Sequence, residues 1–444
     1  MDARIDPLLV RDLREQVADE MTRARQRREQ AGRPELSTED ERQFALSVIS
    51  GAVQRHQAGV LAGGGELPVD TGYDMRLVMA IESAIYRAGV FQDLLDDNSI
   101  ENIDINGCDE VWVTYADDRG KTLYPPIAAT DEDLIGIVQN LAAYASMNAR
   151  PFTRANPELD LRLPDGSRLS AVVSASERPI VSIRRNRYPQ MFLDRLVALG
   201  TVDDRLACFL DAAVRARMNI VVAGATDAGK TTLLRSLINC IDPDERLITV
   251  ERSLELGLRR HPELHRDVVE LEEVLPDAEG HGGLTIRELV RRTRRHNPSR
   301  VIVGEVLGPE VVEMLSAMSQ GNNGSLSTLH ARSAVDVFAK LAQYAGQYEQ
   351  VDYSVAQSLI AGAVDFVVFI GKNRLQGGRR CVSTVLEVAG APDGRVASAA
   401  IFTRSPRDGR AARALDVSIS ADRDAELADA GYDDTADLFV YGDL

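Results

Sequence analysis

The sequence predicts an α/β protein with a mainly parallel sheet, preceded by an α+β N-domain and a small N-terminal helical module. Its 444 residues exceed the roughly 100–200 that one domain usually holds, so several domains are expected. From about residue 192, helical segments alternate with short apolar strands, a pattern typical of a parallel sheet covered by helices. A glycine run near residue 63 separates the N-terminal helical periodicity from the rest of the chain.

Composition and charge argue against several classes of protein. The chain is 44% hydrophobic and 27% charged, as in an ordinary globular protein. Its net charge of -17 opposes a general affinity for phosphate backbones, so no nucleic-acid partner is expected. The four cysteines form no CxxC pair and the N-terminus has no signal-like segment, which predicts a reduced, cytoplasmic chain. Apolar runs are far shorter than the roughly 20 residues that span a bilayer, so we expect any membrane association to be peripheral.

Residues 1–62 are predicted to form the helical module. Leu9, Leu13, Val17 and Met21 recur at helical spacing, and a capping-box pattern begins at residue 38. Residues 63–73 contain the glycine run and a proline, which indicate a flexible linker.

Residues 74–190 are predicted to form the α+β N-domain. A helix is expected over 75–89, and short strands around 103–105 and 111–113. A proline–aspartate–glycine–serine turn at 164–167 separates two further strands.

Residues 191–371 are predicted to form the domain with the parallel sheet. Its expected strands are Ile220–Val222, Leu247–Val250, Val301–Val303, Leu326–Leu329 and Phe366–Phe369. Residues 372–444 are predicted to be a C-terminal appendage, and its acidic end from Asp422 is expected to be a solvated tail or weakly packed.

A phosphate-binding loop is the strongest local motif. The motif G-x-x-x-x-G-K-[ST] fits between a predicted strand and a helix, over Gly224, Ala225, Thr226, Asp227, Ala228, Gly229, Lys230, Thr231 and Thr232. Its glycines let backbone N–H groups face phosphates, Lys230 reaches the β and γ oxygens, and Thr231 is the expected Mg²⁺ ligand. The motif predicts a P-loop enzyme that binds ATP and Mg²⁺. Asp227 is unusual in an anion-binding loop, and we expect it to point to solvent, where its charge is screened.

Carboxylates after the neighbouring strands are candidates for the metal shell and the attacking water. Glu305 ends an apolar strand and is expected to hold the Mg²⁺ shell. Glu255 is favoured as the base that polarises water, while Glu251 remains the alternative base or a second acid of the metal shell. A structural role as a capping or ion-paired acid is the alternative for either. His330, at the end of another strand, is the candidate sensor of the γ-phosphate.

Four ordered motifs resemble the hexameric ATPases of the type II/type IV secretion and type IV pilus superfamily, with the tight-adherence (Tad) pilus branch as the nearest match. The motifs are the P-loop, an Asp box at 248–255, a Walker B strand at 301–306 and a His box at 321–331. The similarity extends upstream to 160–168 and 182–185 and covers about residues 74–370. Departures from the family pattern include Arg252, Asn297, Leu307 and Asn322.

The resemblance implies a sensor-like N-domain hinged to a RecA-like ATPase core, assembled as a ring of six. It implies nucleotide bound between the two domains and contacted by arginines, and the matching positions are Arg162, Arg168, Arg184, Arg185 and Arg295. The implied function is a cytoplasmic motor on the inner face of the cell membrane that couples ATP hydrolysis to pilus assembly or protein secretion. The implied partners are further copies of the chain and an inner-membrane platform protein.

Several alternatives remain open from the sequence. The arginines between 287 and 300 fit a solvated helix face, a subunit or nucleotide contact, or a nucleic-acid stripe. A RecA-like nucleic-acid translocase is opposed by the acidic charge and the lack of clustered aromatic residues. A GTPase lacks its base-reading motif here. A nucleotide-binding scaffold with little turnover is allowed by the departures from the family pattern.

Overall fold

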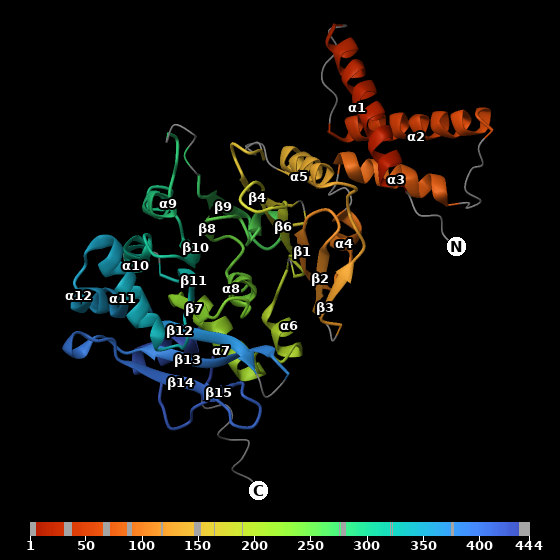
Figure 1. Cartoon of the computed structure of the whole chain (residues 1–444). Helices are drawn as coiled ribbons and strands as arrows, with labels where there is room; N and C mark the ends of the chain where they lie inside the picture. The colour runs from red at the N-terminus through yellow and green to blue at the C-terminus, as the bar shows by residue number, and fades with distance from the viewer. Residues whose placement is uncertain are drawn as a thin grey trace. The chain divides into compact units, whose positions relative to one another are not determined.

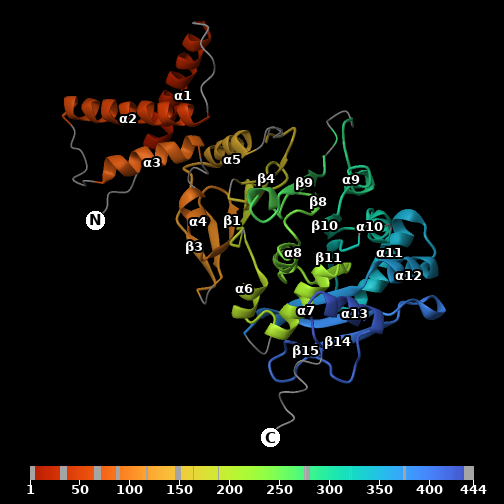
Figure 2. The ribbon, with the colours of Figure 1, turned by 180° about the vertical axis from the view of Figure 1, so that it is seen from behind.

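The chain forms two compact units, Met1–Arg187 and Tyr188–Leu444, each with its own core (Figures 1 and 2). The computed structural model describes residues 6–30, 38–64, 72–86, 91–116, 119–145, 152–163, 165–188, 190–274, 276, 281–319, 321, 323–373 and 377–434. Most of the predicted linker, the end of the acidic tail, and Asn322 lie outside this set. Among the described residues, no helix combines the length and apolarity needed to cross a bilayer.

Three helices at the start of the first unit share one apolar core. They are α1 (Pro7–Gln30), α2 (Thr38–Ala62) and α3 (Tyr73–Tyr86). Leu13 and Val17 of α1 pack in a common cluster with Ile49 of α2 and with Leu77 and Ile81 of α3. The helix that the sequence analysis grouped with the α+β domain therefore buries its apolar face in the helical module.

The rest of the first unit is an antiparallel sheet with helices. Its elements are α4 (Gln92–Asp96), β1 (Ile100–Asn106), β2 (Val111–Tyr115), β3 (Lys121–Tyr124), α5 (Asp131–Ala145), β4 (Glu158–Arg162), β5 (Arg168–Val172) and β6 (Ile180–Arg184). The strand order is β3-β2-β1-β6-β5-β4, and all neighbouring strands are antiparallel. Along β4, β5 and β6 buried side chains alternate with exposed or partly exposed ones, so this part of the sheet buries one face.

The second unit begins with alternating helices and strands. These are α6 (Leu193–Ala198), α7 (Asp204–Arg215), β7 (Ile220–Gly224), α8 (Lys230–Ile238), β8 (Arg246–Glu251), β9 (Asp267–Glu272), α9 (Ile286–Thr293), β10 (Arg300–Val306), α10 (Val311–Ser319), β11 (Leu326–His330), α11 (Asp336–Glu349), α12 (Tyr353–Ala363) and β12 (Phe366–Asn373). It ends with β13 (Arg379–Val388), β14 (Ser398–Arg404), β15 (Ala411–Arg413) and α13 (Ala421–Asp429).

The sheet of the second unit is mixed. Its order is β15-β14-β13-β12-β7-β11-β10-β8-β9. Neighbours from β12 to β9 are parallel, which brings the carboxyl ends of β7, β11, β10 and β8 to one edge. The parallel pairing predicted for residues 191–371 is therefore confirmed. Strands β13, β14 and β15, from the predicted C-terminal appendage, extend the sheet in antiparallel pairing, so the sheet as a whole is mixed.

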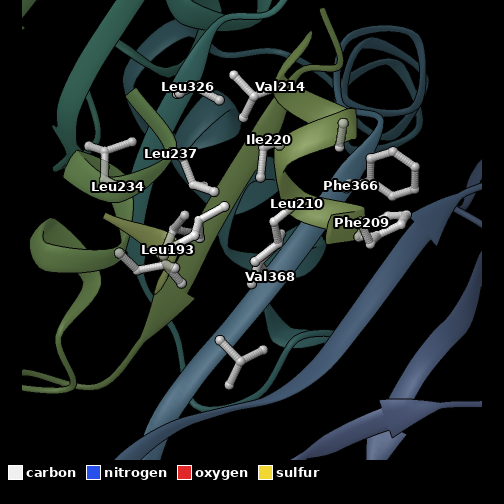
Figure 3. Close-up of a cluster of buried hydrophobic side chains, with 14 of the residues drawn as sticks. Leu193, Phe209, Leu210, Val214, Ile220, Leu234, Leu237, Leu326, Phe366 and Val368 are labelled. Atoms are coloured by element: carbon white, nitrogen blue, oxygen red, sulfur yellow. The ribbon is translucent and has the colours of Figure 1, made fainter. Parts of the chain in front are cut away.

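Helices cover both faces of this sheet. Ile220 and Val222 of β7 join a cluster that includes residues of α6, α7, α8 and α13. Val221 and Ala223 of the same strand join the other cluster, with residues of α9 to α12. Figure 3 shows part of the first cluster, in which Leu210 of α7 lies beside β7 and β12. Because alternate residues of a strand point to opposite faces, a strand buried on both sides is continuously apolar.

The C-terminal segment is packed as far as residue 434, contrary to the expectation of a solvated or weakly packed end. Leu427 and Tyr432 are buried in the cluster that includes α7, and the ring of Tyr432 lies edge-on to that of Phe209, with the ring centroids 5.3 Å apart. Asp434 accepts hydrogen bonds from Arg413, with an Nε to Oδ1 distance of 2.7 Å. The prediction was wrong because it rested on the acidic residues of the segment and not on Leu427 and Tyr432, which hold it against the core.

Candidate functional site

The phosphate-loop motif lies between a buried strand and a helix, as predicted. β7 ends at Gly224, and α8 begins at Lys230 after the N-cap residue Gly229, whose φ is +96°. A Cβ on Gly224 would approach the backbone oxygen of Ile370 to 2.2 Å, so the neighbouring strand β12 leaves no room for a side chain. The loop therefore presents a helix N-terminus and its free N–H groups, which is the local structure that binds phosphate.

Lys230, His330 and Glu305 form one hydrogen-bonded chain. Lys230 Nζ lies 3.1 Å from the backbone oxygen of Ala225 and 3.0 Å from His330 Nδ1. His330 Nε2 lies 2.7 Å from Glu305 Oε1. An ammonium group only donates, so Nδ1 accepts and the proton of the neutral ring sits on Nε2, which donates to Glu305. Three of the predicted site residues, from α8, β11 and β10, are thus brought together.

The surroundings of His330 favour its neutral form. Burial lowers the pKa of the ring below 6.5, the positive charge of Lys230 lowers it further, and the Glu305 carboxylate only partly opposes them. Lys340 holds the strand end from the other side, since its Nζ donates to the His330 backbone oxygen at 2.6 Å. The neutral ring keeps one acceptor toward Lys230 and one donor toward Glu305.

Glu251 is buried beside Gly304, at the end of β8. A Cβ on Gly304 would lie 2.8 Å from Glu251 Cγ, so the glycine makes room for this side chain. Glu251 Oε2 accepts hydrogen bonds from the backbone N–H groups of Glu255 and Leu256, at 2.8 and 3.0 Å. Its Oε1 is buried without a hydrogen-bond partner in the structure. Burial raises the pKa of Glu251 to about 7.

Glu255 lies in the loop that Glu251 holds. Its backbone oxygen accepts a hydrogen bond from Arg235 of α8 at 2.8 Å, and its side chain is half-buried. Arg235 itself is buried and also donates to the Tyr188 backbone oxygen. The loop is thus held through two backbone N–H groups and one backbone carbonyl.

Asp227 does not rely on solvent to screen its charge, which corrects the sequence expectation. Its carboxylate lies 2.8 Å from Lys372 Nζ and 2.6 Å from an Arg380 nitrogen. Arg380 Nε also donates to the Asp227 backbone oxygen at 3.0 Å. Lys372 and Arg380 were not predicted from the sequence. The signal that could have indicated them is a pair of basic residues on either side of a Gly-Gly turn, together with one unexplained acid in the loop.

Three of the arginines singled out by the resemblance form a row across the sheet of the first unit. Register places Arg162 opposite Arg168, and Arg168 opposite Arg184. Residues next to each of them along the strands are buried on the other face, so the row lies on the more exposed face. We refer to Arg162, Arg168 and Arg184 as the arginine row.

Arg185 points away from the arginine row. Its side chain is 4% exposed, and NH1 donates to the backbone oxygens of Leu94 and Asp97 at 2.8 and 3.1 Å. Burial lowers the pKa of the guanidinium below 12.5. This placement corrects its assignment to the nucleotide: the side chain ties β6 to α4.

The arginines between 287 and 300 have different surroundings. Arg295 is exposed in the turn after α9, whereas Arg287 pairs with Glu349 at 2.7 Å and Arg294 pairs with Glu313. Arg300 is buried and bonded to Glu245. Arg300 is thus a structural residue of the sheet, whereas Arg291, Arg292 and Arg295 are exposed.

The groups gathered at this sheet edge fit a nucleotide and Mg²⁺. Mg²⁺ prefers oxygen ligands and usually keeps several waters, so it needs only one or two protein groups. The Thr231 hydroxyl and the Glu305 carboxylate are of this kind, and the bare Oε1 of Glu251 is a further oxygen acceptor. Among the described residues, no group of three or more His, Cys, Asp or Glu is arranged to hold a metal ion.

Comparison with known proteins identifies the family. A family model described as "Type II/IV secretion system protein" matches residues 87–368, more than half of the chain. A Mycobacterium tuberculosis protein provisionally named a conjugal transfer protein is 32% identical over 331 residues, which cover 72% of this chain and 90% of that protein. The protein VirB11 of Agrobacterium fabrum is 30% identical over 305 residues, 62% of this chain and 85% of its own length.

A solved structure is also similar in sequence. The VirB11 ATPase of the Brucella suis type IV secretion system, in complex with sulphate, is 26% identical, with a TM-score of 0.36, and the match covers 70% of this chain and 96% of that one. The family match and the mycobacterial relative lead to the same assignment. The chain belongs to the family of type II/IV secretion system proteins.

Proposed function

We propose that the chain is a P-loop ATPase that couples ATP hydrolysis to pilus assembly or protein secretion. The observation that carries the proposal is the chain of contacts from the loop through Lys230 and His330 to Glu305. A phosphate loop, a sensing histidine and a metal-side carboxylate in contact with one another are the parts that phosphoryl transfer needs. Family membership supports the same reading.

The chain's own residues have distinct roles in this mechanism. ATP and Mg²⁺, when bound, supply the phosphoryl group and neutralise its developing charge. Lys230 would exchange the Ala225 oxygen and His330 for phosphate oxygens, and Thr231 and Glu305 would hold the metal shell. His330, released by Lys230, retains its donor to Glu305 and offers Nδ1 as an acceptor, so its hydrogen bonding reports whether the lysine is engaged.

We assign Glu255 as the base that polarises the attacking water. Glu251 already uses one carboxylate oxygen to fix the backbone of Glu255 and Leu256, so we assign it as the positioning residue for that loop. Arg235 holds the same loop from α8. Both acids named from the sequence therefore have a role: Glu255 acts on the water, and Glu251 positions the loop that carries Glu255.

The wider assembly is part of the proposal. We propose a RecA-like core, a homo-hexamer and the tight-adherence pilus branch, with the arginine row and Arg295 contacting nucleotide in the ring. A cytoplasmic position on the inner face of the membrane, against a platform protein, fits the function. Light scattering of the purified chain with nucleotide is expected to give six copies per particle. A strictly monomeric chain under all conditions would contradict the ring.

Phosphate release by the purified chain tests the ATPase proposal. Lys230→Ala removes the cation that faces the phosphates and is expected to lower the rate at least about 100-fold. Lys121→Ala is the matched control, because Lys121 lies in the first unit and pairs with Asp104 at 3.2 Å. Equal rates in the wild type and Lys230→Ala would overturn the enzyme. Turnover that depends on added polynucleotide would favour a translocase instead.

A further inference from the structure

Two basic side chains hold the phosphate-binding loop from outside the site. Lys372 of β12 and Arg380 of β13 are directly opposite in the strand register, and both contact Asp227. Arg380 also donates from Nε to the Asp227 backbone oxygen, and its Cδ would lie 3.3 Å from a Cβ on Gly229. The hairpin β12–β13 thus touches the loop at its acid, at its backbone and at the N-cap of α8.

Electrostatics explains why these three residues occur together. Like charges directly opposite each other across two strands repel, and a carboxylate between them removes the repulsion. A lone acid in a phosphate-binding loop repels its ligand, and two cations neutralise it. One set of contacts therefore solves both problems. The groups are about one third to one half exposed, so the energy of each ion pair is modest and the geometry matters more than the charge.

The loop backbone needs such support. Asp227 has a φ of +59°, in the left-handed region that non-glycine residues rarely adopt, although aspartate and asparagine tolerate it. Gly229 follows in the same region. A loop fixed in this form before binding does not lose further conformational freedom when the ligand arrives, which increases affinity.

We propose that Asp227, Lys372 and Arg380 form a loop clasp that holds the phosphate-binding loop in its binding form and so sets the affinity for the phosphate groups of the nucleotide. The three are positioning residues and take no part in the chemical step. The inference rests on the proposed function for the identity of the ligand. It goes further in making the β12–β13 hairpin a determinant of nucleotide affinity.

The variant Asp227→Asn gives opposite results for the clasp and for simple charge repulsion. Asparagine keeps the size and tolerates the left-handed backbone, but it has no charge to hold Lys372 and Arg380. If the clasp positions the loop, the dissociation constant for MgADP, measured by calorimetry on the full chain, rises about five- to tenfold. If the acid only repels phosphate, the same variant binds MgADP more tightly. Unchanged or tighter binding would overturn the proposal.

A double-mutant cycle and steady-state rates give the second readout. Arg380→Met alone weakens binding. In combination with Asp227→Asn it adds less than it does alone, because the ion pair is already lost and only the bond from Arg380 Nε to the Asp227 backbone oxygen remains to be removed. The KM for ATP should rise more than kcat falls. Additive losses, or a fall in kcat as large as the rise in KM, would overturn the positioning role.

Asp267→Asn is the matched control. Asp267 pairs with Arg246 at 2.5 Å, with similar exposure, on β9 and β8 at the other edge of the sheet. Its MgADP affinity is expected to equal that of the wild type. Wild-type protein that binds no MgADP would refute the proposed function itself, whereas wild-type binding with an unaffected Asp227→Asn variant would refute the clasp alone.

Discussion

Cations line up across neighbouring strands in both units, but they face different surroundings. In the second unit, Lys372 and Arg380 have the carboxylate of Asp227 between them. In the first unit, the arginine row crosses β4, β5 and β6 on the more exposed face of the sheet. The acids Asp160 and Asp104 of that face belong to the adjacent row, opposite Ser170 and Ser182.

This difference indicates how each group of cations is used. Aligned like charges are costly, and an anion lowers that cost. The second unit supplies its anion from the phosphate loop, so its cations stabilise the protein's own backbone. In the arginine row, Arg184 is exposed, whereas Arg162 and Arg168 are partly buried. Three guanidiniums on neighbouring strands suit the charge of a phosphate ligand, which is the role proposed for them.

The largest expected change in the free energy of unfolding comes from a buried arginine of the second unit that is paired with a carboxylate of the same unit. Arg300 is 1% exposed, and it donates to both carboxylate oxygens of Glu245, at 2.6 and 2.9 Å, and to the Val214 backbone oxygen. Arg300→Met leaves Glu245 partly buried with Arg217 as its other guanidinium contact. We expect the free energy of unfolding in urea to fall by about 3 kcal/mol.

Arg266→Met is the control for this prediction. The Arg266–Asp244 pair has the same 2.6 Å separation, but both side chains are about two thirds or more exposed. Its loss should change the free energy of unfolding by less than about 0.5 kcal/mol. Equal losses of unfolding free energy for the two substitutions would show that a buried ion pair contributes no more to stability than an exposed one in this unit.

The next largest change in the free energy of unfolding is expected at Glu251, a buried acid whose hydrogen bonds come from backbone N–H groups. Burial raises the pKa of Glu251 from 4.5 to about 7 in the folded state. At pH values between these two pKa values, folded Glu251 keeps a proton that the unfolded chain has lost. The stability that this proton contributes is therefore fully present below pH 4.5 and is lost as the pH rises through 7. Glu251→Gln removes the titration. Relative to wild type, the variant should gain about 2–3 kcal/mol of unfolding free energy from pH 4.5 to pH 8.

Urea titrations at several pH values check this prediction. Parallel pH profiles for wild type and Glu251→Gln would show that the carboxylate is already ionised across the range. An internal comparison is available in the first unit, where the hydrogen bond from Arg178 lowers the pKa of Asp131. Stability from that pair is lost as pH falls, which is the opposite sign to Glu251.

Much of the fold was predictable from the sequence because its signals are strong. The strands β7, β8, β10 and β12 have apolar runs at their centres, as burial on both faces requires, and β11 has Ser327 and Thr328 between two leucines; each of the five was predicted. β9 was missed because it is an edge strand with charged or half-buried residues, Asp267 to Glu272. The pairing of β13 to β15 depends on contacts between distant segments, which local patterns do not encode.

The candidate site was predictable to a similar extent. The motif residues Lys230, His330 and Glu305 were named from the sequence, and the structure brings them into contact. The loop clasp was not predicted, because Asp227 is 145 residues from Lys372 and 153 from Arg380. Arg185 was named from the sequence as a site residue together with Arg184. Because successive side chains along a strand point to opposite faces, Arg184 lies in the arginine row and Arg185 makes other contacts, among them a hydrogen bond to the Leu94 backbone oxygen.

The smallest expected effect is the most direct test of the comparison. Arg168→Glu places an acid between Arg162 and Arg184, so that the arginine row resembles the clasp of the second unit. Cross-strand attraction should raise the free energy of unfolding by about 0.5 kcal/mol. The internal acid now competes with an external phosphate, so kcat/KM for ATP should fall about tenfold, or about 1.4 kcal/mol in transition-state stabilisation.

The two readouts together separate a structural row from a functional one. Arg168→Gln is the companion variant, because it removes the charge without supplying an acid, and its loss of kcat/KM should be smaller than that of Arg168→Glu. A fall in kcat/KM accompanied by an equal fall in stability would mean that Arg168 only supports the sheet. Stability that rises while kcat/KM stays at the wild-type value would mean that the exposed row and the internal clasp share an arrangement of charges but not a ligand.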